Sequence, residues 1–119
     1  MNSNRRITSA DLANPDHAAA VLHLLDAYAR DPMGGGGALS DYARSHLIAR
    51  LRERPGVHVL LAFFDDTPAG LAICMEGFST FACKPLVNVH DVAVLAGYRG
   101  QRIGERMLEL VETLARERG

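Results

Sequence analysis

Apolar and polar positions follow two different periods along the chain. From residue 15 to about 54, apolar side chains recur every three or four positions, which is typical of amphipathic helices. Between residues 57 and 94 the runs VHVLLAFF, AGLAICMEGF and LVNVHDVAV are short and rich in branched side chains, which is typical of strands. A short alternating run, RRIT, precedes the first helix, and the helical period returns from residue 103 onwards. The pattern predicts the order strand, helix, helix, strand, strand, strand, helix.

Local sequence signals mark where these elements begin and end. Asn14 followed by Pro15 is a favourable helix start, and Ser40 is a good cap for the second helix. The run DDTP predicts a turn, so residues 57–78 are predicted to form an antiparallel hairpin. The strand LVNVHDVAV is nearly apolar throughout, which predicts burial in the middle of a sheet.

The run MGGGG separates the two predicted helices. Consecutive glycines favour neither helix nor strand. We interpret this run as a flexible linker, and the alternative is a mobile loop that closes over a substrate.

Length and composition narrow the classes of protein. The 119 residues suit a single domain, residues 1–119, and the net charge of −1 argues against general binding to nucleic acid or an anionic membrane. We find neither a signal peptide nor a long apolar run, and therefore expect a cytoplasmic protein. Cys74 and Cys83 form no CxxC motif and the five histidines lack metal-ligand spacing, so no disulfide and no metal are expected.

The stretch AGYRGQRIGERML places glycines and arginines between a predicted strand and a predicted helix. This composition is typical of an anion held by backbone amides at a helix N-terminus. A P-loop needs Gly-Lys-Ser/Thr, whereas Gly104 precedes Glu105 and Arg106. A Rossmann fingerprint needs a different glycine spacing and more chain after it. The remaining alternative is the pyrophosphate loop of an acyl-CoA-dependent N-acyltransferase.

YRGQRIG, following HDVAV, resembles motif A of the GNAT family of N-acetyltransferases, Arg/Gln-x-x-Gly-x-Gly/Ala after a central strand. The matching positions are Arg99, Gly100, Gln101, Arg102, Ile103 and Gly104, and Arg102 stands where the family has its middle glycine. The predicted element order resembles the N-terminal two-thirds of the family. The stretch GFSTFACKP before the central strand is also similar to the diamine and polyamine acetyltransferase branch.

The resemblance implies an α/β (α+β) fold with a mixed sheet and acetyl-CoA as co-substrate. Backbone amides of residues 100–105 would face the pyrophosphate, and the central strand would pair with the pantetheine amides. The implied cofactor-binding residues are Val92, Ala93, Val94, Arg99, Gly100, Gln101, Arg102, Ile103, Gly104 and Glu105.

Acetyl transfer in this family is direct attack of a neutral amine on the thioester. An alkyl amine titrates near pH ~10.4, so a group must accept its proton, and a backbone donor must stabilise the oxyanion. The resemblance implies His90 and Asp91 as catalytic candidates. The polyamine branch has acidic residues at both positions, so Asp91 matches its pattern and His90 does not. Glu76 is a third candidate proton acceptor, and structural roles for all three residues are the alternative.

The family's next strand, and a following helix that commonly carries a tyrosine, have no counterpart in these 119 residues. An apolar edge would then stay open after residue 95. We therefore expect either a fragment of a longer protein, a strand supplied by a partner chain, or a homodimer. The predicted function is N-acetyl transfer to a primary amine of a small molecule (polyamine-like or amino-acid-like) or a protein. The alternative is a truncated CoA-binding or dimerisation module with little activity.

Overall fold

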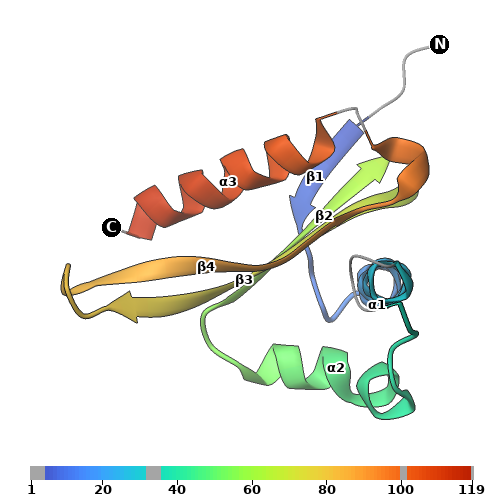
Figure 1. The fold of residues 1–119 in the computed structure, drawn as a ribbon, viewed down its shortest axis with the longest axis horizontal. Coiled ribbons are helices and arrows are strands. Elements are labelled where there is room, and N and C mark those ends of the chain that lie inside the picture. The colour runs from blue at the N-terminus through green and yellow to red at the C-terminus, as the bar shows by residue number, and fades with distance from the viewer. Residues whose placement is uncertain (1–4, 32–35, 100–101, 119) are drawn as a thin grey trace.

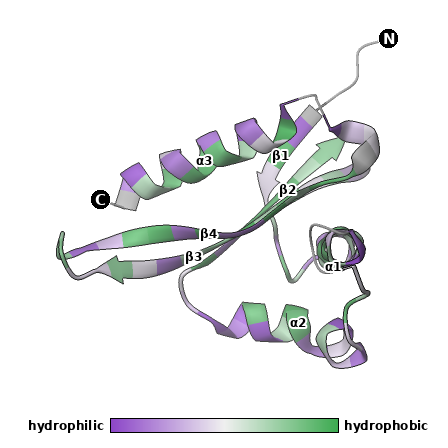
Figure 2. Ribbon diagram, viewed as in Figure 1, coloured by the Kyte–Doolittle hydropathy of each residue, from purple (hydrophilic) through white to green (hydrophobic). Residues whose placement is uncertain are grey.

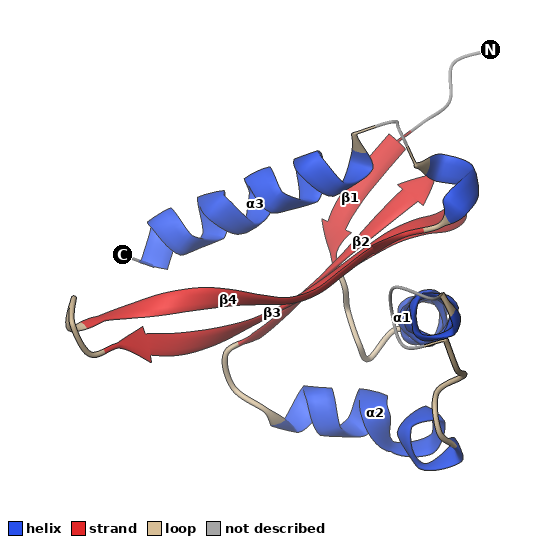
Figure 3. Cartoon of the chain, viewed as in Figure 1, coloured by secondary structure: helices blue, strands red, loops and turns tan. Residues whose placement is uncertain are grey.

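The described residues form four strands and three α-helices in the predicted order (Figure 1; Figure 3). The computed structural model describes residues 5–31, 36–99 and 102–118. The elements are β1 (Arg5–Ser9), α1 (Pro15–Arg30), α2 (Asp41–Glu53), β2 (Val57–Phe64), β3 (Thr67–Ser79), β4 (Lys84–Val94), the 3₁₀ turn η2 (Ala96–Tyr98) and α3 (Ile103–Arg118). The strands form one sheet in the order β1-β2-β3-β4, and each pair is antiparallel. The α/β fold and its element order are confirmed.

Helices cover both faces of the sheet (Figure 1). Successive strand residues point to opposite faces, so each strand contributes to two hydrophobic cores. The α1 cluster consists of Ala20, Val21, Leu24, Val59, Leu61, Phe63, Leu71 and Ile73. The α3 cluster consists of Leu60, Ala62, Ala69, Ala72, Cys74, Ile103, Met107 and Val111. The molecule is therefore a sheet between two helical layers, and the apolar side of α3 faces the sheet (Figure 2).

The helix starts follow from their capping residues, as predicted. The Asn14 side chain accepts the Asp16 N–H at 2.9 Å, and the Ser40 hydroxyl accepts the Ala43 N–H at 3.1 Å. Each bond satisfies an amide that has no partner inside its helix. The predicted hairpin is β2 and β3, joined by a tight turn with Asp65 at φ 56°.

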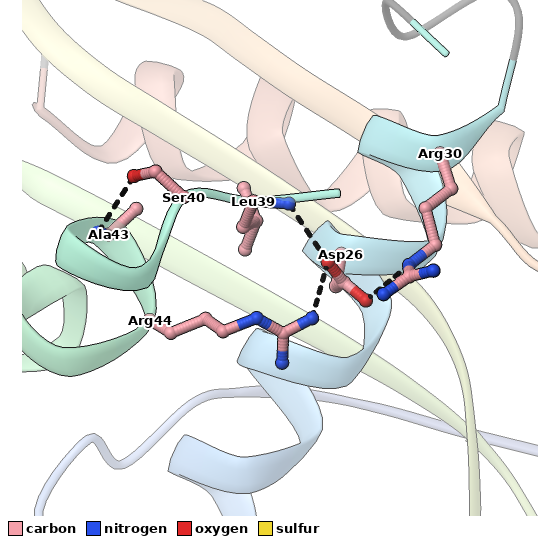
Figure 4. Close-up of polar contacts among 6 residues, drawn as sticks. All are labelled: Asp26, Arg30, Leu39, Ser40, Ala43 and Arg44. Carbon is pink, nitrogen blue, oxygen red and sulfur yellow. Dashed lines mark hydrogen bonds and ion pairs between the residues drawn. The ribbon is translucent and has the colours of Figure 1, made fainter. Parts of the chain in front are cut away.

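A single carboxylate ties α1 to the start of α2 (Figure 4). Asp26 accepts the Leu39 N–H at 3.0 Å and forms ion pairs with Arg30 and Arg44, both at 2.8 Å. The hydrogen bond from the Leu39 amide, reinforced by both arginines, lowers the pKa of Asp26.

The glycine run lies partly outside the described residues, which exclude 32–35. Of its last two residues, Gly36 donates to the Asp31 carbonyl at 3.1 Å and Gly37 to the Ala29 carbonyl at 3.0 Å. The described end of the run is therefore hydrogen-bonded back onto the end of α1.

The structure corrects one prediction about β4. The strand lies at the edge of the described sheet and none of its residues is buried, so the prediction of a central buried strand was wrong. Its apolar sequence has another cause, because Val92 and Val94 pack against the α3 cluster. β3 and β4 are also longer than predicted, and their hairpin extends beyond α2 and α3 to an exposed Phe81 (Figure 1).

Candidate functional site

The chain passes from the end of β4 through the 3₁₀ turn η2 to the start of α3. Leu95 donates its N–H to the Ala69 carbonyl at 2.9 Å, and after the 3₁₀ turn the helix begins at Ile103. The predicted loop residues Gly100 and Gln101 lie outside the described residues. The first turn of a helix has N–H groups without intrahelical acceptors and carries the positive end of the helix dipole. Ile103, Gly104 and Glu105, all predicted from the sequence, occupy this turn.

Gly104 leaves space at the helix start that no protein group needs. A Cβ atom there would meet Val94 Cγ2 at 3.9 Å, an ordinary van der Waals distance. The glycine borders a cavity of about 310 Å³, which is lined by Val94, Tyr98, Arg99, Arg102, Ile103 and Gly104. Because internal packing does not require a glycine at this position, the open backbone is accessible to a ligand.

Arg102 has the backbone conformation that a glycine adopts easily. Its φ is 63°, in the left-handed region, which costs an L-residue about 1–2 kcal/mol. Its carbonyl accepts the Arg106 N–H at 3.0 Å and so begins the helix. The substitution noted in the sequence has therefore kept a glycine-like backbone while adding an exposed cation, whose nearest acidic partner is Glu105 at 3.9 Å.

The backbone of β4 faces the open edge at alternate residues. The Leu95 N–H points to β3, and backbone groups change direction from one residue to the next along an antiparallel strand. The N–H and C=O groups of Ala93 therefore point to β3 as well. Val92 and Val94 then direct their N–H and C=O groups away from the sheet. Two of the three strand residues predicted to bind the cofactor therefore have backbone groups that face the open edge.

A groove of about 370 Å³ lies between the C-terminal half of α1 and this part of β4. Its lining comprises Leu24, Ala27 and Tyr28 from α1, the helix C-cap Asp31, Val92, Ala93 and Val94 from β4, and the following Leu95 and Arg99.

Arg99 joins the two sides of this groove. Its Nε donates to the Val94 carbonyl at 3.0 Å, and its Nη2 donates to Asp31 Oδ2, also at 3.0 Å. Asp31 is not among the site residues that the sequence predicts. The two residues are 68 positions apart, and no local pattern could have paired them.

The two catalytic candidates meet at a β-bulge. Asp91 pairs with Ile73 and Val89 pairs with Cys74, so His90 is an extra residue in β4. His90 Nε2 lies 3.9 Å from Asp91 Oδ2, with the histidine exposed and the carboxylate half-buried. Through its pairing with Ile73, Asp91 lies on the face of the sheet that α1 covers.

Glu76 lies on the other face. It follows Cys74 by two residues in β3, and its Oε1 lies 3.3 Å from His58 Nε2. The structure therefore brings His90 and Asp91 together and separates them from Glu76.

Comparison with known proteins identifies the family. Residues 19–119 match the family model described as the acetyltransferase (GNAT) family. The chain belongs to the GNAT family. The GNAT fold recurs in the crystal structure of a probable acetyltransferase, which shares 25% identity at a TM-score of 0.78 over 95% of this chain and 73% of that chain. No protein of curated function matches the sequence.

Two further GNAT-like structures resemble this chain in fold. A ribosomal-protein-alanine N-acetyltransferase from Brucella melitensis has a TM-score of 0.76 at 18% identity, over 97% of this chain and 74% of that chain. An aminoglycoside acetyltransferase from an uncultured soil metagenomic sample, in complex with sisomicin, gives the same TM-score and identity over 97% of this chain and 72% of that chain. At this identity the likeness establishes the fold only.

The described part of this GNAT chain lacks the features of a membrane span and of a metal site. None of its helices is long and apolar enough to cross a membrane. Its histidine, cysteine and acidic side chains form no group of three or more that could hold a metal ion. Both cysteines are free thiols, and burial raises the pKa of Cys74.

Proposed function

We propose that this protein transfers an acetyl group from acetyl-CoA to a primary amine by direct attack. One observation carries the proposal: the outward-facing backbone of Val92 and Val94 leads into the open first turn of α3 at Gly104. These backbone groups, from Val92 to Gly104, form a strip that suits a long ligand with amides at one end and phosphates at the other. The residues present therefore fit CoA.

Each part of the strip has a complementary part of the ligand. Val92 and Val94 would pair with the pantetheine amides, with Ala93 between them. The first-turn amides of Ile103, Gly104 and Glu105, together with the preceding Gly100 and Gln101, would hold the pyrophosphate. The exposed cation of Arg102 would add a charge-assisted contact, as would Arg99 once released from its present partners. Acetyl-CoA supplies the acetyl group as a thioester.

The reaction also requires one proton to leave the amine. A C–N bond replaces the C–S bond, nitrogen loses a proton and sulfur gains one. We assign Asp91 to holding the amine and accepting its proton, directly or through water, with His90 beside it. The position of Glu76 on the opposite face argues against the third candidate.

The groove beside β4 bears on the choice of amine. Among the described residues that line it, Asp31 is the only carboxylate, and Arg99 neutralises it. In the free protein the groove therefore offers little attraction for a second ammonium group, whereas transfer of Arg99 to the phosphates of CoA would remove that neutralising charge from Asp31. The lining of the groove thus does not decide between an amino-acid-like acceptor and a polyamine. The names of the two enzymes described above give different acceptors, a ribosomal protein and an aminoglycoside. The shared fold therefore does not decide between small molecules and proteins as acceptors.

The open edge of β4 supports the alternative function, a CoA-binding or dimerisation module. Eleven residues of β4 form the edge of the described sheet, and Val89 is exposed on it. Such an edge can accept a strand from a second copy. Sedimentation equilibrium would detect the homodimer. Dissociation of the homodimer by CoA would show that the second copy and CoA bind to the same edge.

The test compares three chains by calorimetric titration with acetyl-CoA and desulfo-CoA. We expect saturable binding to the wild type and none to Gly104→Glu, whose carboxylate would occupy the place of the pyrophosphate. Glutamate near a helix N-terminus favours the helix, so loss of binding would not reflect unfolding. Gly104→Ala is the structural control, since its Cβ has room beside Val94.

Acetyl transfer is then assayed with amino-acid esters, polyamines and peptides. Wild-type affinity in Gly104→Glu would refute the cofactor site. Binding without transfer to any amine would support the module instead of the enzyme.

A further inference from the structure

Arg99 is held by two groups that belong to different parts of the fold. Its Nη2 lies 3.0 Å from Asp31 Oδ2 at the end of α1, and its Nε lies 3.0 Å from the Val94 carbonyl at the end of β4. The side chain therefore bridges the groove between these elements, and Asp31, Val94 and Arg99 all line that groove.

Both ends of this bridge involve groups that the proposed function requires. The Val94 carbonyl faces the open edge of β4, where a ligand amide would need it as an acceptor. Arg99 also lines the cavity at Gly104, where phosphate would lie, but the charge of its guanidinium is satisfied by Asp31. In this conformation the bridge and a ligand on β4 require the same atoms.

The bridge can open through the arginine side chain alone. The backbone of Asp31 is fixed, because its N–H donates to the Ala27 and Tyr28 carbonyls that end α1. The Arg99 side chain is 57% exposed, so water can replace its contacts as it moves. Ion pairs this exposed are weak, and a phosphate offers more charge and more acceptor oxygens than one carboxylate.

We infer that Asp31 is a positioning residue that holds Arg99 across the end of β4 in the free protein and competes with the phosphates of CoA for its guanidinium. The inference rests on the proposed function, because it requires CoA to bind along β4. Binding then exchanges Asp31 for phosphate and releases the Val94 carbonyl for the ligand.

The experiment measures CoA and inorganic pyrophosphate affinity at low salt in the wild type, Asp31→Asn, Arg99→Gln and the double variant. Asparagine keeps the size of Asp31 but loses its charge, so we expect Asp31→Asn to bind CoA about two- to fivefold more tightly, the range of an exposed ion pair. Arg99→Gln should bind more weakly, and adding Asp31→Asn to it should change nothing further. Asp41→Asn, the same charge change at the start of α2, is the matched control and should bind as the wild type does.

A second measurement follows the bridge directly. In nitrogen NMR spectra, the Arg99 Nε–H signal should shift on addition of CoA, and Asp31→Asn should move the free-protein signal towards the bound position. Circular dichroism confirms that each variant is folded.

The outcomes separate the two proposals. If the wild type binds CoA and Asp31→Asn binds no more tightly, the competition is refuted and the cofactor site stands. If the double variant also binds CoA more tightly than Arg99→Gln does, the effect comes from net charge and the bridge is refuted. If neither the wild type nor Asp31→Asn binds CoA, both proposals fail together.

Discussion

Gly70 in β3 lies directly against Ile103, the first residue of α3: a Cβ atom on Gly70 would come within 3.0 Å of Ile103 Cγ2. Met107 Cε at 3.2 Å and Ala62 Cβ at 3.3 Å would be almost as close. The start of α3 can approach the sheet only because position 70 has no side chain. This contact sets where the first-turn amides lie relative to the end of β4.

Gly70→Ala is therefore expected to destabilise the protein. The added methyl group would push Ile103 away from the sheet, and overpacking of this kind costs about 1–3 kcal/mol, partly offset by the lower flexibility of the unfolded chain. We expect a net loss of about 1 kcal/mol in the free energy of unfolding, measured by urea denaturation, with weaker binding of CoA.

The matched control is Gly97→Ala, because a Cβ at Gly97 would meet no atom within 4 Å. That variant should unfold within ~0.5 kcal/mol of the wild type, as surface substitutions do. Equal stability of both variants would contradict close packing at Gly70.

Arg102→Gly should stabilise the protein. With φ at 63°, Arg102 is in a conformation that glycine adopts without a steric cost. Relief of this strain exceeds the entropy lost with glycine, so we expect a gain of about 0.5–1 kcal/mol in urea denaturation.

Arg106→Gly removes the same charge from the helical conformation and serves as the control, with an expected loss of about 1 kcal/mol. CoA affinity should fall in Arg102→Gly if the guanidinium contacts phosphate. A destabilised Arg102→Gly would show that this backbone is not strained.

Asp26 should make stability depend on pH in the acidic range. Its pKa is lowered in the folded protein, from an ordinary value of 3.8, chiefly by the Leu39 amide and then by Arg30. A lowered folded pKa means that the stabilising effect is complete above the unfolded value and is lost as the pH falls through the folded value.

The difference in unfolding free energy between the wild type and Asp26→Asn should therefore be constant at neutral pH and shrink below pH ~4. Arg52→Gln, an exposed change on α2, provides the control and should follow the wild-type profile. A difference that stays constant down to pH ~2 would exclude Asp26 as the source.

Asp91→Asn should separate binding of the amine from binding of acetyl-CoA. Losing a charge-assisted hydrogen bond to the amine should raise its KM about tenfold while the KM for acetyl-CoA changes little. His90→Gln tests whether the neighbouring side chain shares this role. A larger change in the KM for acetyl-CoA would remove Asp91 from the acceptor site.

Features set by neighbouring residues could be predicted from the sequence. Asn14 and Ser40 cap their helices through amides two or three positions ahead, and α3 begins at Ile103 as its apolar spacing indicates. The hairpin of β2 and β3 needs only two strand-forming runs and a turn. In each case the interaction that decides the structure lies within a few residues.

Other features depend on residues that are distant in the sequence, and only the tertiary structure decided them. The extra residue at His90 is defined by its pairing with β3, and the edge position of β4 by the order of the strands. In the free protein Arg99 is paired with Asp31, because folding brings the end of α1 next to the end of β4. The sequence by itself determined the helices, the strands and the residue types at the loop. The direction of the backbone groups and the partners of the charged side chains depended on how the helices and strands pack.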